Sequence, residues 1–390
     1  GPSGLFSSTK ERINIVPAHE AISSANPIRV MIVDDSAVIR GLTTRILESD
    51  DTIQVVASVG NGKLAVTNLA RYDVDVVVLD IEMPVMDGLT ALPELLKIDP
   101  SVKVVISSTL TARNANISIQ ALEAGASDYI PKPTSTADIH AEGGFRRELM
   151  DKVKALGTAR RQKVQPSSNV ERKAGAPRAP VAVKPVDHTY TLRNAGNPNP
   201  KILAVGSSTG GPQALLEFFK NLSPSINLPV VLTQHMPPTF TTILAQHISK
   251  MTEWECREGI DGEELIIGTI FLAPGDYHML VAERDGKKVI ELNQDPPENF
   301  CQPAVDPMLR SVVKVFGEKV LTVILTGMGA DGQKGCAEVI DRGGTVVAQD
   351  EETSVVWGMP GAVAMAGLCS AVLPLRDLAP HVMNFVGKGR

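Results

Sequence analysis

A serine in a turn of small residues is the first position at which the sequence could support covalent chemistry. Gly206, Ser208 and Gly210 have the G-x-S-x-G spacing of a nucleophile elbow, in which glycines permit a tight turn that exposes the middle serine. A helix that begins after this turn would favour developing negative charge. The same residues could instead cap a helix or bind a phosphate, so the turn alone does not establish catalysis.

A serine hydroxyl needs a base, and a neutral imidazole suits that task near pH 7. Of the seven histidines, His235 has the best position, because it follows the apolar run 230–234 and opens a loop with two prolines. It would therefore lie on the same rim as Ser208. His278, which follows a Pro-Gly-Asp turn, remains an alternative.

The base in turn needs a carboxylate that fixes its tautomer. Asp331 is the preferred candidate, because it lies in a glycine-rich turn after the apolar run 320–325. Main-chain N–H groups of that turn could also form an oxyanion hole. Asp276 and Asp306 remain alternatives, and Asp331 could simply cap the next helix. Three rim loops that offer Ser, His and Asp indicate a serine hydrolase, and their order differs from the Ser, Asp, His order of α/β-hydrolases.

A second set of reactive groups lies in the first third of the chain. Asp34 and Asp35 end the first predicted strand, and Asp80 ends the third. Crowded carboxylates attract a hard divalent cation such as Mg²⁺, which would allow the Asp80 carboxylate to attack phosphorus. Ser107 and Lys132 follow the next two strands and could bind the phosphoryl oxygens. Each residue alone has a simpler explanation; Asp35, for example, could cap a helix.

Alternating strands and helices must position both sets. The first series predicts strands at 29–33, 54–59, 74–79, 103–107 and 128–130, and helices at 36–49, 62–72, 89–98, 117–124 and about 136–156. The second predicts strands at 202–205, 230–234, 269–273, 320–325 and 345–348, and helices at 213–221, 240–251, 308–315, 333–342 and 359–366. Both series predict α/β domains with a doubly wound parallel sheet, in which ligands bind at the carboxyl ends of the strands.

The changes in composition divide the chain into four segments. We expect a flexible N-terminal arm at 1–27, a first domain at 28–156, a Pro-rich basic linker at 157–200 and a second domain at 201–390. The linker has few large apolar residues, so it cannot bury enough surface to fold alone. It could alternatively dock an acidic partner.

The overall composition is that of an ordinary globular protein, with 43% hydrophobic and 21% charged residues. A net charge of −6 provides no attraction to nucleic acid, and no apolar run is long enough for membrane insertion. The start of the chain does not resemble a secretory signal, and the four scattered cysteines indicate reduced thiols. We therefore expect a cytoplasmic protein.

The first acidic set belongs to a recognisable pattern. Residues 33–36, 79–88, Ser107 and 132–133 together resemble the response-regulator receiver domain, a flavodoxin-like fold. The resemblance implies that Asp80 accepts a phosphoryl group from a histidine kinase.

The same resemblance implies the other roles in this domain. Asp34 and Asp35 would hold Mg²⁺ together with Asp80 and the main-chain carbonyl of Glu82. The implied switch residues are Ser107, Tyr129 and Lys132.

The second domain resembles another family. Residues 206–211, 234–237 and 326–332 look like the catalytic motifs of the chemotaxis protein-glutamate methylesterases, the CheB family, whose catalytic domain is Rossmann-like. The resemblance implies a Ser208, His235 and Asp331 triad. Thr209 would support the site, and the Met328 amide would stabilise the oxyanion.

This family resemblance also implies a substrate and a control. Family members hydrolyse glutamyl methyl esters on the cytoplasmic bundle of chemoreceptors during sensory adaptation, and many deamidate glutamines. The receiver would cover the triad until phosphorylation opens it. Ester hydrolysis by the triad would need no cofactor, and Mg²⁺ would serve only the receiver.

Three other functions compete with this interpretation. A DNA-binding regulator would have a helix-turn-helix and a basic output domain, which the sequence does not show. A nonenzymatic scaffold would tolerate loss of the triad residues, all of which are present. A nucleotide-binding output domain would need a Walker lysine, but Pro212 follows the glycines.

Overall fold

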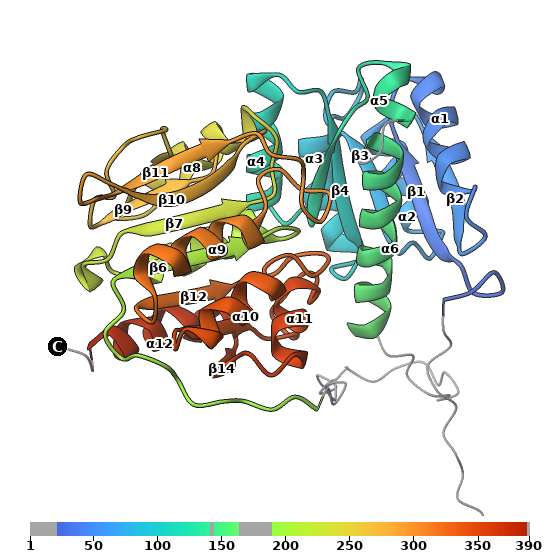
Figure 1. Ribbon diagram of the computed structural model, residues 1–390. Helices are drawn as coiled ribbons and strands as arrows, with labels where there is room; N and C mark the ends of the chain where they lie inside the picture. Colours follow the sequence, from blue (N-terminus) through green and yellow to red (C-terminus); the bar gives the residue numbers. More distant parts are fainter. Residues whose placement is uncertain (1–21, 141–143, 164–188, 388–390) are drawn as a thin grey trace, which may run out of the picture.

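The computed structural model describes residues 22–140, 144–163 and 189–387. It contains two parallel sheets that lie side by side, each covered by helices (Figure 1). Most of the expected arm and linker, residues 1–21 and 164–188, lies outside the described residues. No helix of the described chain is both long enough and apolar enough to cross a membrane.

The first sheet has five parallel strands in the order β2-β1-β3-β4-β5. The strands are β1 (Ile28–Val33), β2 (Ile53–Val59), β3 (Val76–Asp80), β4 (Lys103–Ser108) and β5 (Asp128–Pro131). The helices are α1 (Ala37–Leu47), α2 (Gly62–Leu69), α3 (Gly88–Ile98), α4 (Ala112–Glu123), α5 (Thr136–His140) and α6 (Phe145–Lys163). The strand order reverses between β1 and β3, where a doubly wound sheet forms its ligand site.

Alternate residues of the central strand β1 face the two layers of helices. Val30 and Ile32 pack in one apolar cluster with Leu149 of α6, whereas Met31 and Val33 pack in the cluster that contains Leu92 of α3. Burial on both faces explains why the strands of this sheet are almost continuously apolar.

The last helix of the first domain differs from the prediction. We expected one helix from about 136 to 156, but the structure has α5 and a separate α6 that continues to Lys163. The extension is stabilised by ion pairs that a search for apolar periodicity does not detect. Arg160 and Arg161 both pair with the buried Asp75 carboxylate at 2.7 Å, so α6 continues past the helix end expected near residue 156.

The second sheet has seven parallel strands in the order β14-β13-β12-β6-β7-β9-β8. The strands are β6 (Ile202–Ser207), β7 (Val230–Gln234), β8 (Glu255–Glu258), β9 (Thr269–Leu272), β12 (Val320–Ile324), β13 (Thr345–Gln349) and β14 (Ala371–Leu373). The helices are α7 (Gly211–Asn221), η1 (Pro224–Ile226), α8 (Phe240–Met251), α9 (Val305–Phe316), α10 (Gln333–Asp341), α11 (Met359–Met365) and α12 (Leu375–Gly387). Both domains therefore confirm the predicted doubly wound α/β fold.

Several elements of the second domain were not predicted. β8 has one buried residue, Cys256, among charged neighbours, β14 is three residues long, and α12 contains Pro380. The strands β10 (His278–Arg284) and β11 (Lys287–Asn293) form an antiparallel hairpin outside the parallel sheet. A simple βα rhythm does not lead one to expect such a hairpin.

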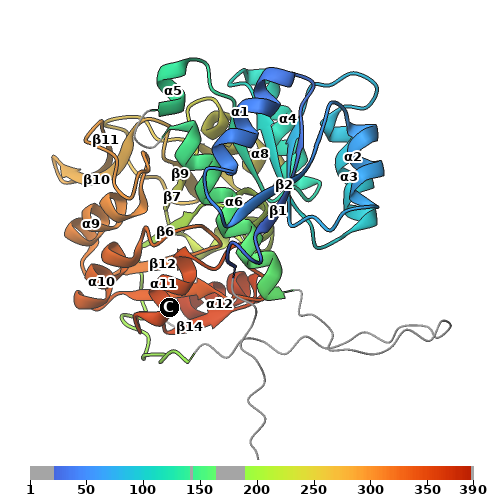
Figure 2. The same ribbon diagram turned by 90° about the vertical axis from the view of Figure 1, so that its right-hand side faces the viewer.

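The two domains share an apolar cluster. The Tyr129 ring of β5 stacks on the Phe240 ring of α8, with centroids 4.5 Å apart and planes at 16°. At the edge of this contact, His247 of α8 hydrogen-bonds Glu123 of α4 at 2.9 Å. Helix α6 runs along the other side of the boundary, between the first sheet and the second domain (Figure 2).

Candidate active site and phosphorylation site

The candidate nucleophile lies in the turn between β6 and α7, at the point where the strand order reverses between β12 and β6. Gly210, at φ +76°, begins α7 in the left-handed conformation that favours glycine. The main-chain N–H of Ser208 donates to the Thr326 carbonyl at 3.0 Å. A side chain at Gly327 would lie 3.0 Å from the Ser208 Cβ, so the two loops meet closely only because residue 327 is glycine.

The candidate base and acid are in direct contact. His235 directly follows β7, and its Nε2 lies 2.7 Å from Asp331 Oδ2. Asp331 is 1% exposed, and the main-chain N–H of Val305 donates to the same oxygen at 2.6 Å. Burial opposes ionisation of Asp331, but the hydrogen bond and charge of His235 more than offset it and lower the Asp331 pKa. The residue is therefore an anionic partner for the imidazole.

The alternative candidates have other positions. Asp306 contacts the loop of Asp331, with its N–H donating to Asp331 Oδ1 at 3.0 Å, and it makes no hydrogen bond to His235 in the described chain. His278 is buried and bonds the main chain of Pro296 and Ala304. Asp276 lines the same cavity as Ser208.

The Cys301 thiol contacts Nδ1, the ring nitrogen of His235 that does not face Asp331. Its Sγ lies 3.4 Å from Nδ1, whereas within the described ranges no hydrogen bond joins the Ser208 hydroxyl to the ring. Burial alone lowers the pKa of His235, but Cys301 and the Asp331 carboxylate outweigh burial and raise it to about 10. Both ring nitrogens contact groups other than the Ser208 hydroxyl, so this arrangement is unproductive for hydrolysis.

The triad candidates nevertheless share one cavity of about 640 Å³, which both domains line. The second domain contributes Ser208, His235, Asp331 and Met328 to its wall. The predicted oxyanion donor therefore lies at the same cavity as the nucleophile. Sequence reasoning missed Asn299 and Cys301, which also line the cavity, because they are isolated in a polar loop without a motif.

The first domain supplies part of the wall of this cavity. Its contributions include Asp128, Tyr129, Arg147 and Lys152. The Thr209 hydroxyl, next to the nucleophile, donates to the Asp128 carboxylate. The Arg147 guanidinium lies 3.1 Å from the centroid of the Phe300 ring. Thr209, expected to support the triad, is thus held by the first domain in this state.

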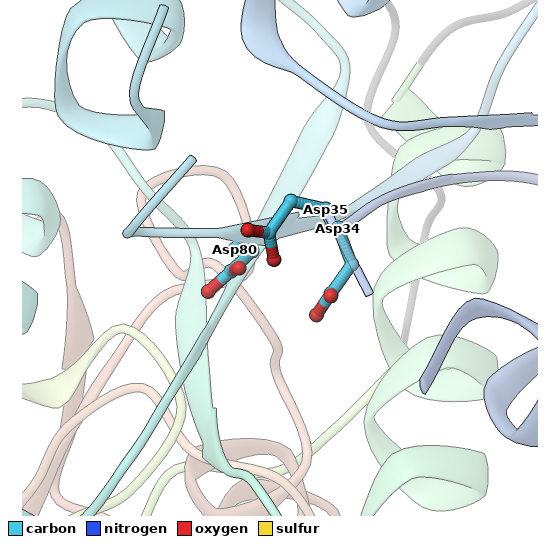
Figure 3. Close-up of side chains that lie close together, drawn as sticks. All are labelled: Asp34, Asp35 and Asp80. Atoms are coloured by element: carbon cyan, nitrogen blue, oxygen red, sulfur yellow. The ribbon is translucent and has the colours of Figure 1, made fainter. Parts of the chain in front are cut away.

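The three acidic side chains of the first domain converge at the carboxyl ends of β1 and β3 (Figure 3). Carboxylate oxygens of Asp34, Asp35 and Asp80 all lie within 4.8 Å of one another. These hard oxygen donors fit Mg²⁺, which prefers carboxylate, carbonyl and water ligands.

The side chain of Lys132 lies beside these carboxylates, as the sequence predicted. Its ammonium is 2.8 Å from both Asp34 Oδ2 and Asp80 Oδ1. Burial raises the pKa of Asp80 to about 6, even though Lys132 opposes this shift. Ser107, at the end of β4, pairs in register with Asp80.

The other two residues implied for this site have different surroundings. The Tyr129 ring stacks on Phe240 across the domain boundary. In this state its contact is therefore with the second domain and not with the carboxylates. The Glu82 side chain pairs with Arg113 at 3.7 Å, which leaves its predicted role to the main-chain carbonyl.

Sequence models of two families match this chain. The model described as response regulator receiver domain matches residues 30–142, and the one described as CheB methylesterase matches residues 203–382. The crystal structure of the Thermotoga maritima CheB methylesterase catalytic domain is 40% identical, with a TM-score of 0.47; the match covers 48% of this chain and 98% of that one.

Relatives match along nearly the whole chain. The protein-glutamate methylesterase/protein-glutamine glutaminase of Azospirillum brasilense is 54% identical over 377 residues, which is 94% of each chain. Protein-glutamate methylesterase/protein-glutamine glutaminase 1 of Paramagnetospirillum magneticum is 54% identical over 380 residues, 94% of this chain and 100% of that one. The chain therefore belongs to the CheB methylesterase family, in the form that carries a response regulator receiver domain before the catalytic domain.

Proposed function

We propose that this protein hydrolyses glutamyl methyl esters on the cytoplasmic domains of chemoreceptors, and thereby serves adaptation in chemotaxis. The observation that carries the proposal is the meeting of Ser208, His235 and Asp331 at one cavity. The names of the relatives support the substrate and suggest glutamine deamidation as a second activity. We further propose that the protein acts in the cytoplasm and that a chemotaxis histidine kinase is its phosphodonor, since a receiver domain implies a kinase.

The geometry assigns a role to each ring nitrogen of His235. The contact with Asp331 requires the hydrogen on Nε2, which leaves Nδ1 as the nitrogen that accepts the Ser208 proton. Ser208 attacks the ester carbonyl, the protonated His235 gives its proton to departing methanol, and water repeats these steps on the acyl-enzyme. The Met328 amide stabilises the oxyanion. The triad supplies base and nucleophile, so we assign no metal to this reaction.

The receiver residues carry the regulation. Asp80 is the acceptor of the phosphoryl group, and Asp34, Asp35 and the Glu82 carbonyl would join it in holding Mg²⁺, which would neutralise charge at the phosphoryl group. Ser107 and Lys132 bind the phosphoryl oxygens, and Tyr129 responds with Ser107. Because Tyr129 stacks on Phe240, any movement of its ring disturbs the domain boundary directly.

Activation requires both an open cavity and a free imidazole nitrogen. In the closed state, Cys301 occupies His235 Nδ1 and Asp128 holds the Thr209 hydroxyl. Phosphorylation need not create a site; it has only to favour a state in which the receiver releases Thr209 and Cys301, which belongs to the catalytic domain itself, leaves His235 Nδ1.

An Asp128→Ala substitution should raise basal activity in the absence of a phosphodonor. It removes the acceptor of the Thr209 hydroxyl and one partner of Lys152, whose ammonium lies 3.5 Å from Asp128. A lost interaction of about 1–2 kcal/mol would shift the closed state toward the open one by roughly 5- to 30-fold. Methanol release from a methylated receptor fragment measures this change.

The matched control is Asp138→Ala. Asp138 is a partly exposed receiver carboxylate that accepts a hydrogen bond from the Thr134 hydroxyl within the same domain. It should leave basal activity unchanged. An unchanged basal rate in folded Asp128→Ala would show that this contact does not restrain the enzyme.

The substrate assignment is tested with receptor fragments that carry either methyl glutamate or glutamine at the modification sites. The full-length protein, supplied with Mg²⁺ and a small-molecule phosphodonor, should release methanol from the first fragment, and mass spectrometry should show glutamate there. Ammonia from the second fragment would establish the deamidase activity. No methanol from several methylated receptors would contradict the proposed substrate.

A further inference from the structure

We propose that Asn299 and Asp306 are positioning residues that hold Asp331 in its working orientation. The inference rests on the proposed triad and adds two residues to it. The Asn299 amide nitrogen lies 3.0 Å from Asp331 Oδ1 and 3.1 Å from Asp306 Oδ2. Its two N–H hydrogens can therefore bridge the two carboxylates, one hydrogen to each.

Asp306 holds the main chain that carries Asp331. Its Oδ1 accepts from the N–H of Gly332 at 3.1 Å and from the N–H of Gly335 at 2.7 Å. These bonds anchor the turn directly after Asp331 and the first turn of α10. Asp306 thus restrains the backbone of the acid, while Asn299 restrains its side chain.

The Asp331 carboxylate also accepts hydrogen bonds from main-chain N–H groups at the start of α9. The N–H groups of Val305 and Asp306 donate to its Oδ2 and Oδ1 at 2.6 and 3.0 Å. Together with Asn299 and His235, these groups engage both oxygens, so Asp331 is fixed in the plane that faces the imidazole. Its orientation decides which ring nitrogen of His235 carries the hydrogen.

The electrostatic cost of this arrangement argues against a packing role alone. Asp306 is 1% exposed and lies beside a second buried carboxylate. Burial first, and the charge of Asp331 in addition, raise the pKa of Asp306. A bridging amide donor offsets the repulsion between the two carboxylates, which an apolar residue could not do.

The loop that carries Asn299 is held in a defined conformation. Asn299 and Phe300 have φ values of +52° and +63°, in the left-handed region. The buried His278 ring holds both ends of the loop, because its Nε2 donates to the Pro296 carbonyl at 3.0 Å and its Nδ1 accepts from the Ala304 N–H at 3.2 Å. The loop therefore delivers the Asn299 amide to a fixed place.

Two substitutions at position 299 separate positioning from folding. Asn299→Gly removes the amide but retains the freedom for positive φ. Asn299→Asp keeps the size and the tolerance for this backbone, yet it places a third carboxylate against Asp331 and Asp306. Position 299 is exposed on the surface, so neither change should unfold the protein. Gln302→Ala is the matched control, since its amide holds the same loop through the Asp295 carbonyl at 2.7 Å.

The full-length protein would be assayed by methanol release from methylated receptor fragment with phosphodonor and Mg²⁺. In Asn299→Gly we expect kcat to fall roughly 10- to 100-fold with KM unchanged, as for a misplaced catalytic group. A loosened Asp331 stabilises the His235 cation less, so the acid limb of kcat/KM should move to lower pH. In Asn299→Asp the added negative charge should move that limb to higher pH.

Among the described residues, the titratable groups around Asp331 and His235 are Asp306, Glu298 and Cys301, and Glu298 is paired with Arg310 at 2.9 Å. A wild-type kcat and pH profile in both Asn299 variants would overturn the proposal, as would an equal loss of kcat in Gln302→Ala. Ser208→Ala in the same assay distinguishes a failure of the proposed triad from a failure of the positioning role. If it retains activity, the proposed triad is wrong; if it is inactive while the Asn299 variants are normal, only the positioning role is wrong.

Discussion

Ser208→Ala is expected to release methanol roughly 10⁴- to 10⁶-fold more slowly than the wild-type protein under phosphorylating conditions. The substitution removes the attacking oxygen but no hydrogen bond of the side chain to the described residues, so the free energy of unfolding should change little. Methanol release and thermal unfolding, measured on the same preparation, check both parts of this expectation.

The neighbouring Ser207→Ala variant provides the contrast. The Ser207 hydroxyl is buried and donates to Gln234 Oε1 at 2.6 Å, so its loss should cost about 1–3 kcal/mol of stability. It leaves the hydroxyl at 208 in place, and most of the chemistry should survive below the unfolding temperature. Loss of hydrolysis in Ser207→Ala with full activity in Ser208→Ala would show that Ser207, and not Ser208, is the nucleophile.

Asp331→Asn should reduce kcat by roughly 10⁴-fold, although the side chain keeps its shape. The Oδ1 position receives two donors, from Asn299 and the Asp306 N–H, so the amide oxygen is expected there and the amide nitrogen beside His235 Nε2. An amide nitrogen cannot accept the Nε2 hydrogen, so the tautomer with hydrogen on Nδ1 becomes favoured. Nδ1 is the nitrogen that must accept the Ser208 proton. In the substituted enzyme, His235 would therefore be held in the tautomer that cannot accept the Ser208 proton.

The pH profile of this variant has a definite sign. Burial lowers the pKa of His235, whereas Cys301 and Asp331 raise it, so loss of the Asp331 charge should lower it. The residual activity of Asp331→Asn should consequently persist to lower pH than that of the wild type. An acid limb that moves to higher pH, or a kcat within tenfold of wild type, would contradict the role of Asp331.

The positions of the reactive residues could be predicted because each follows a strand. Asp80 in the first sheet, and Ser208 and His235 in the second, come directly at or after runs of buried apolar residues, and in each sheet the carboxyl ends of the parallel strands meet at one edge. Local pattern and fold class were therefore sufficient to bring these groups together.

The environment of the imidazole could not be predicted in the same way. Cys301 and Asn299 lie in a loop without periodicity, and their contacts with His235 and Asp331 span 66 and 32 positions of sequence. Asp306 was considered only as a rival acid, whereas the structure places it beside the acid. Contacts of this kind depend on how a hairpin and a helix start fold over the sheet.

The end of the last helix of the first domain was missed for a related reason. The extension of α6 past residue 156 depends on Arg160 and Arg161, which bind the buried carboxylate of Asp75. Asp75 lies 85 and 86 positions before them in the sequence. A basic, polar segment looks like a linker until its acidic partner is known. The stacked Tyr129 and Phe240 rings likewise join segments that belong to different domains.

Gating of the triad by the receiver is tested most directly by the rate of methanol release from a methylated chemoreceptor fragment. The rate would be measured with and without a small-molecule phosphodonor and Mg²⁺, in the wild-type protein and in Asp80→Ala. We expect a clear rise with the donor in the wild type and none in Asp80→Ala, because Asp80 is the proposed acceptor of the phosphoryl group. A rise of equal size in Asp80→Ala, or a wild-type rate that ignores the donor, would contradict gating of the triad by the receiver.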